Sequence, residues 1–169
     1  PLSVCNTGTV NLAASSIVSG PQTQPTGYCV SNATSTFDEE ILNVTLGTLN
    51  NTSNCTVVAP GPGSLLNQYA NYTTSVAAPN LNKGSNYALS IDIGTCNGLF
   101  SSGTKVFIDY NRDGDFVDAG EEVFVSAAAI NGPHLSTATI TIPMTASVGV
   151  TRMRVVNVET TLVTGITPC

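Results

Sequence analysis

Turn-forming residues interrupt this chain at short intervals, and this feature restricts its fold most. Clusters of Gly, Pro and Asn separate short segments rich in Thr, Val and Ile, which favour extended backbone. The clearest segment covers 86–93, where Tyr87, Leu89 and Ile91 alternate with small or polar residues. This period of two is typical of a half-buried antiparallel strand. No segment keeps a helical period over about ten residues, so we expect an all-β fold.

Many short strands at this spacing predict an Ig-like antiparallel β-sandwich with an N-terminal strand arm. We expect the strands of the sandwich at 40–49, 55–58, 72–77, 86–93, 104–110, 122–126, 136–142 and 151–158. The arm precedes them. A β-prone stretch over 9–18 is followed by a polar stretch that contains Pro21 and Pro25, which is typical of a linker. We therefore divide the chain into an arm with its linker, 1–26, and a sandwich domain, 27–169.

The charge of the chain excludes some partners. Only 9% of the residues are charged, and 5 Lys and Arg stand against 11 Asp and Glu, which gives a net charge of −6. A nucleic-acid-binding protein needs a basic face, which five scattered cations cannot form. No apolar run reaches the length of about 20 residues that spans a bilayer. We therefore expect no nucleic-acid partner and no membrane span.

The five cysteines favour disulfide bonds. None stands in a C-x-x-C pair, and a single histidine cannot complete a Cys/His zinc site. A low-charge, Thr- and Asn-rich β chain suits an extracellular location, where disulfides persist. With their pairing left open, the disulfide candidates are Cys29, Cys55, Cys96 and Cys169. This leaves Cys5 on the arm as a free thiol or an intermolecular bond; the alternative is that Cys5 joins a nearby cysteine.

Six of the eleven acidic residues lie in one stretch, 109–122. Its spacing, D-x-N-x-D-G-D, places oxygen ligands at alternate positions and allows a sharp turn at Gly114, as in loops that wrap Ca²⁺. The twelfth position is Gly120 instead of the Glu of an EF-hand, and a strand precedes the loop in place of a helix. We predict a calcium loop on a β-scaffold, with the ligands Asp109, Asn111, Asp113, Asp115, Asp118 and Glu122. Glu121 is an alternative to Glu122 as the last ligand. The alternative is a solvated acidic turn without metal.

Other polar residues do not form a catalytic pattern. The G-x-S-x-G motif of serine hydrolases is absent, and His134 follows the turn residues Gly132 and Pro133, which is typical of a surface histidine. Arg152 and Arg154 alternate onto one strand face, where we expect them to pair with acids. We therefore predict that the protein is not an enzyme.

Several segments resemble the GEVED domain family. The opening of the family's domain resembles three segments of this chain, Tyr28-Cys29, 40–51 and 69–73. Its most specific motif is similar to residues 106–124, which include VFIDYNRDGDF and GEEVF. Its later R-x-R strand resembles residues 149–155. The resemblance covers about 27–169. It implies a β-sandwich module of large secreted bacterial proteins, found beside adhesins and hydrolases, at the cell surface or outside the cell. It also implies metal binding at the acidic loop.

One departure from the family suggests how the chain assembles. The family continues after its Pro-Cys with a Gly-Glu-Val-Glu-Asp-Tyr strand, whereas this sequence stops at Pro168-Cys169. A sandwich that lacks a strand exposes a groove and unpaired backbone groups. We therefore predict that the segment 9–18 donates a strand, anchored by Val10, Leu12, Ala14 and Ile17. The alternative is that the sequence is a trimmed or proteolytic fragment of the family's domain.

Two destinations are open for this donor strand. If it enters a neighbour, the head-to-tail contact builds a fibre or pilus-like homopolymer. If it folds back, the protein is a rearranged monomer. The alternative function is an adhesive or accessory module of a larger secreted protein, which recognises a carbohydrate or another surface ligand.

Overall fold

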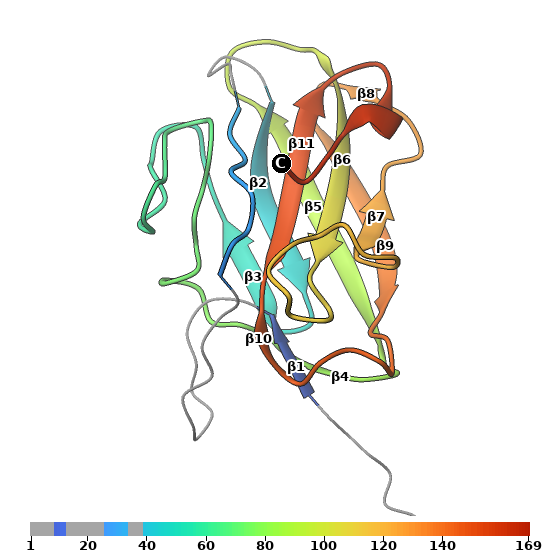
Figure 1. Cartoon of the computed structure of the whole chain (residues 1–169). Coiled ribbons are helices and arrows are strands. Elements are labelled where there is room, and N and C mark those ends of the chain that lie inside the picture. The colour runs from blue at the N-terminus through green and yellow to red at the C-terminus, as the bar shows by residue number, and fades with distance from the viewer. Residues whose placement is uncertain (1–8, 13–25, 34–38) are drawn as a thin grey trace, which may run out of the picture.

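The computed structural model describes residues 9–12, 26–33 and 39–169, and its regular structure is almost entirely strand (Figure 1). A single 3₁₀ turn, η1, covers Val163–Gly165. The strands are β1 Thr9–Leu12, β2 Glu39–Leu46, β3 Leu49–Thr52, β4 Asn80–Asn82, β5 Asn86–Thr95, β6 Ser101–Ile108, β7 Glu122–Val125, β8 Ile130–Asn131, β9 His134–Thr141, β10 Gly149–Thr151 and β11 Met153–Glu159. The predicted all-β sandwich is confirmed.

Two antiparallel sheets form the body of the sandwich. One has the order β3-β2-β5-β9, and the other has the order β11-β6-β7, with β8 pairing to β6 as well. Figure 1 shows the two sheets lying face to face, with β2 beside β11. Alternate residues of the central strands point between the sheets: Leu89, Ile91 and Ile93 of β5 are at most 1% exposed. Burying each such side chain stabilises the fold by about 1.5–3 kcal/mol.

The opposite sheet supplies the other half of the core. Val106 and Ile108 of β6 are fully buried, and Met153 and Val155 of β11 pack against the same cluster. β6 continues directly into the acidic loop, which ends at β7. Both ends of the acidic loop, residues 109–121, are therefore attached to paired strands, β6 and β7.

The arm contributes a strand to the body of its own chain. β1 lies between β4 and β10, antiparallel to the first and parallel to the second. Val10 is opposite Leu81 on one side and Gly149 on the other. Of the predicted anchors, Val10 and Leu12 lie in this strand, whereas Ala14 and Ile17 lie outside the described residues.

Two predicted strands are wrong. Both segments, 55–58 and 72–77, belong to the long loop 53–77 between β3 and β4. In this loop, side chains accept hydrogen bonds from the local backbone. Asn54 Oδ1 accepts from the Thr56 N–H, and Asn71 Oδ1 accepts from the Thr73 N–H. These Asx turns compete with extended pairing, so β-prone Thr and Val residues there form no strand.

One predicted strand is in fact a hairpin. The expected strand 40–49 ends at Leu46, and the chain turns at Gly47 and Thr48 into β3. Gly47 has a φ of +60°, and a Cβ atom there would lie 2.9 Å from the side chain of Leu81. The tight turn therefore requires glycine on two grounds, backbone conformation and space.

All four candidate cysteines are paired. Cys29 bonds Cys169 across a sequence separation of 140, and Cys55 bonds Cys96 across a separation of 41. Among five cysteines this leaves Cys5, which lies outside the described residues. Within the described part of the chain, no helix is long and apolar enough to cross a membrane.

Candidate metal centre

The loop between β6 and β7 begins with a buried carboxylate that organises it. Asp109 has no exposed surface. Its Oδ1 accepts a hydrogen bond from the Arg112 N–H, and its Oδ2 accepts from the Gly114 N–H at 3.1 Å and from the Tyr28 hydroxyl at 2.5 Å. Charge-assisted bonds of this kind are about twice as strong as neutral ones. Asp109 therefore stabilises the first turn of the loop by accepting hydrogen bonds from its backbone.

A second buried carboxylate closes the loop from its other end. Glu121 is 2% exposed, and its Oε1 accepts from the N–H groups of Tyr110 at 2.9 Å and Asn111 at 3.4 Å. Burial raises the pKa of Glu121 to about 6, and the nearby charges of Asp109 and Asp113 add to this rise. Glu121 thus bridges the two ends of the loop through backbone amides.

The remaining acids of the loop gather at the surface. Asp113, Asp115 and Asp118 offer carboxylate oxygens that all lie within 4.8 Å of one another. The Asn111 Nδ2 donates to Asp113 at 2.9 Å and to Asp118 at 2.7 Å. This hydrogen bond from Asn111 is the main reason that the pKa of Asp113 lies below its ordinary value. The four side chains form the acidic cluster of the loop.

The alternating sequence of the loop produces this convergence directly. The N–H of Asp113 donates to Asn111 Oδ1, that of Asp115 donates to Asp113 Oδ1, and that of Val117 donates to Asp115 Oδ1. Each is an Asx turn, in which a side chain bonds the backbone two residues ahead. Successive turns of this kind bring side chains at alternate positions to one side.

The residues present fit a hard cation. Three close carboxylates repel one another without a positive partner, and Ca²⁺ prefers oxygen ligands of this type. The structure brings Asn111, Asp113, Asp115 and Asp118 of the predicted ligand set together. Asp109 and Glu121 instead hold the loop backbone.

Glu122 lies apart from the acidic cluster. Its carboxylate bonds Lys105 Nζ at 2.7 Å, across the pair of strands β6 and β7. Glu122 is therefore not among the acids that converge in the described structure, and its role as a ligand stays a prediction.

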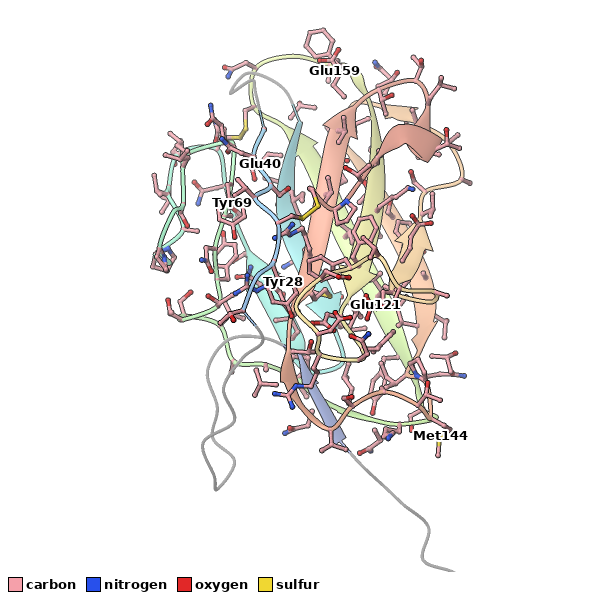
Figure 2. The ribbon with its side chains drawn as sticks, in the orientation of Figure 1. Tyr28, Glu40, Tyr69, Glu121, Met144 and Glu159 are labelled. Atoms are coloured by element: carbon pink, nitrogen blue, oxygen red, sulfur yellow. A yellow bond between two sulfur atoms is a disulfide. The ribbon has the colours of Figure 1, made fainter. Side chains whose placement is uncertain are left out.

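Aromatic and cationic side chains form a cluster beneath the loop. The ring of Tyr28 lies 4.9 Å from that of Phe116, with the Arg152 guanidinium 4.4 Å from the Tyr28 centroid. The Arg154 guanidinium lies 5.0 Å from the Phe116 centroid. Figure 2 shows Tyr28 and Glu121 at the same level of the sandwich, beside the loop. The role of Tyr28 could not be predicted from the sequence, in which only its place next to Cys29 marks it.

Arg154 connects this cluster to a disulfide. The side chain is buried, and it donates to the carbonyl oxygens of Cys29, at 2.9 Å, and Pro168. Its Nη1 also lies 3.3 Å from Cys29 Sγ. The expected pairing with an acid is wrong for Arg154, whose described partners are carbonyl oxygens, a sulfur and an aromatic ring.

A separate cavity of about 570 Å³ lies between the long loop 53–77 and the strands β2 and β11. Glu40 and Tyr69 line it, and Figure 2 shows these two side chains in the space between the loop and β2. Amide side chains add to its lining, among them Asn51, Asn71 and Gln68. Burial raises the pKa of Glu40. The sequence patterns did not predict this cavity.

Comparison with known proteins supports the resemblance inferred from the motifs. Residues 103–169 match the model of the GEVED domain, a stretch that contains the acidic loop, β11 and Cys169. No curated protein and no solved structure matches the chain.

Proposed function

We propose that this chain, which carries the GEVED domain signature over 103–169, is an extracellular structural subunit that assembles by strand donation into a fibre or pilus-like polymer. The observation that supports this proposal is the place of β1. It is the middle strand of a three-stranded sheet, and it is the element through which β4 and β10 are joined in that sheet. The sheet thus has a position for one strand between β4 and β10, and the N-terminal arm fills it with β1.

The same strand can fill this position in a neighbour. Residues 13–25 connect β1 to the body, and an extended chain of that length spans about 40 Å. Exchange of an identical element between copies keeps every hydrogen bond of the closed monomer, which makes it a low-cost route to assembly. A head-to-tail exchange that does not close on itself extends into a filament.

Calcium is the second part of the proposal. Binding by Asp113, Asp115 and Asp118 would neutralise the acidic cluster and hold the loop between β6 and β7 in one conformation. The two disulfides fit the same extracellular setting, since they persist under oxidising conditions. A calcium ion that holds the loop between β6 and β7 in one conformation would suit a structural subunit of a fibre.

Deletion of residues 1–18 tests strand donation. We expect the full chain to form filaments in negative-stain electron microscopy and the deleted chain to stay monomeric by light scattering. A sharper variant is Asn11→Pro, which removes a backbone N–H from β1, opposite Asn80 and Val150. Gln22→Pro in the connection is the matched control and should still assemble. Unchanged assembly by the deleted chain would refute the proposal.

The cavity supports a second candidate, an adhesive module that binds a carbohydrate. Its volume of about 570 Å³ lies within the usual range for ligand sites. Aromatic rings and amides, such as those of Tyr69, Tyr72 and Asn71, suit a neutral sugar. A glycan array probed with the arm-deleted chain tests this function. Binding that is lost in Tyr69→Ala would support the adhesive module, and an array without signal would refute it.

A further inference from the structure

We propose that the Cys29–Cys169 disulfide is a site of thiol–disulfide exchange, in which an incoming thiolate attacks Sγ of Cys169 and Cys29 leaves beside Arg154. The proposal is independent of filament assembly and of calcium. It concerns the chemistry of one bond and its immediate surroundings, and it assigns different roles to the two sulfur atoms.

Crowding around Cys29 favours attack at Cys169. Cys29 is only partly exposed and lies next to Tyr28, whose ring packs against Phe116, and the Arg154 Nη1 lies 3.3 Å from its Sγ. Exchange requires the attacking sulfur to approach the bond from outside, so the sulfur on the less crowded side of the bond is attacked. Cys29 is therefore the leaving group.

Charge favours departure of Cys29. The Arg154 Nη1 lies 3.3 Å from Cys29 Sγ, and the guanidinium donates to the backbone carbonyl of the same residue. A positive charge at this distance stabilises a thiolate, and a stabilised leaving thiolate departs faster. The arginine thus stabilises the same sulfur that the crowding around Cys29 assigns as the leaving group.

The surroundings of Arg154 strengthen this argument. Its side chain is buried, and its described contacts are two carbonyl oxygens, a sulfur and the ring of Phe116, with no carboxylate among them. Burial lowers the pKa of Arg154, because the charged form loses hydration. A thiolate at Cys29 would supply a negative partner, which is not among the contacts of Arg154 with the described residues.

The reaction balances without an oxidant. The bond between Cys29 Sγ and Cys169 Sγ breaks, and a new bond forms between the incoming sulfur and Cys169 Sγ. The electron pair of the broken bond stays on Cys29 Sγ as a thiolate. One disulfide is consumed and one is formed, so the product is a chain that carries a thiol compound covalently at Cys169.

The Cys55–Cys96 bridge is an internal control. Both of its cysteines are only partly exposed. Both bridges meet the same reagent in one sample, so differences in concentration or temperature cannot account for a difference in their rates.

The experiment uses the full chain with Cys5→Ser, so that the bridged cysteines are the ones present. Glutathione is added as a monothiol probe, free thiols are alkylated at set times, and peptides are identified by mass spectrometry. We expect glutathione on Cys169, an alkylated Cys29, and a rate about tenfold above that at Cys55–Cys96. Glutathione on Cys29, or equal rates at the two bridges, would overturn the assignment.

Two substitutions separate charge from packing. Arg154→Gln should slow the exchange by about tenfold, and Arg154→Lys should restore most of the rate, since it keeps the positive charge. Near-ultraviolet circular dichroism shows whether each variant keeps its fold. A folded Arg154→Gln chain that exchanges as fast as the parent would also overturn the proposal.

Discussion

The hydroxyl of Tyr28 donates a hydrogen bond to the carboxylate of Asp109, 81 residues away in the sequence. Tyr28 stands next to Cys29, which is bonded to Cys169, and Asp109 is the first acid of the loop between β6 and β7. Burial and the carboxylate raise the pKa of Tyr28, so the hydroxyl stays protonated as a donor. Together with the packing of the Tyr28 ring against Phe116, this hydrogen bond joins the disulfide-anchored segment to the acidic loop.

Removing that hydroxyl should destabilise the fold. We expect Tyr28→Phe to lower the free energy of unfolding by about 1.5–3 kcal/mol, because a hydrogen bond to a buried charged group is lost. Urea denaturation measures the change. Tyr72→Phe, in the long loop away from Asp109, is the matched control and should lose less. Equal losses in the two variants would show that the Tyr28–Asp109 bond contributes nothing specific.

Calcium affinity should depend on the acidic cluster. Asp113→Asn and Asp118→Asn should each weaken calcium binding by at least about tenfold in isothermal titration calorimetry, since each removes a charged oxygen ligand. Glu122→Gln breaks the ion pair with Lys105 outside the cluster and should bind calcium like the parent. No calcium binding by the parent chain, or full affinity in both Asp variants, would contradict the proposed site.

Glu121 should give stability a distinct pH dependence. Its carboxyl has a pKa of about 6 in the folded chain against an ordinary 4.5, so the folded state binds more protons between these values. This group's contribution to the free energy of unfolding therefore falls as the pH rises from about 4.5 to about 6.

Glu121→Gln should remove this fall. Denaturation curves of parent and variant across pH 4–8, in the presence of a chelator, give the difference. A parent that gains stability relative to the variant as the pH rises would contradict the expected direction of the change.

The two disulfides should stabilise the fold unequally. In the chain-entropy model the benefit grows with the length of the closed loop, and the separations are 140 and 41 residues. Replacing Cys29 and Cys169 by serine should therefore cost about 1 kcal/mol more than replacing Cys55 and Cys96. Urea denaturation in the Cys5→Ser background measures both losses. The reverse order would indicate that local packing around the bridges outweighs loop entropy.

The sequence predicted most strands of the sandwich because their signal is local. In β5 the alternation of apolar and polar residues is itself the burial pattern of a strand with one face in the core. The long loop 53–77 was mispredicted in part, because Thr and Val favour extended backbone only where a neighbouring strand accepts their hydrogen bonds. Local composition does not show whether such a neighbour exists.

The sequence alone determined the alternation of Asn111, Asp113 and Asp115 and the Asx turns that bring these side chains to one side, since each turn involves residues two positions apart. Asp118 joins them through the hydrogen bond from Asn111, seven positions away. Only the tertiary structure decided that Asp109 and Glu121 are buried supports, that Tyr28 holds the loop, and which cysteines are paired. These contacts join residues far apart in the chain. Their formation depends on how the sheets pack, which no local pattern determines.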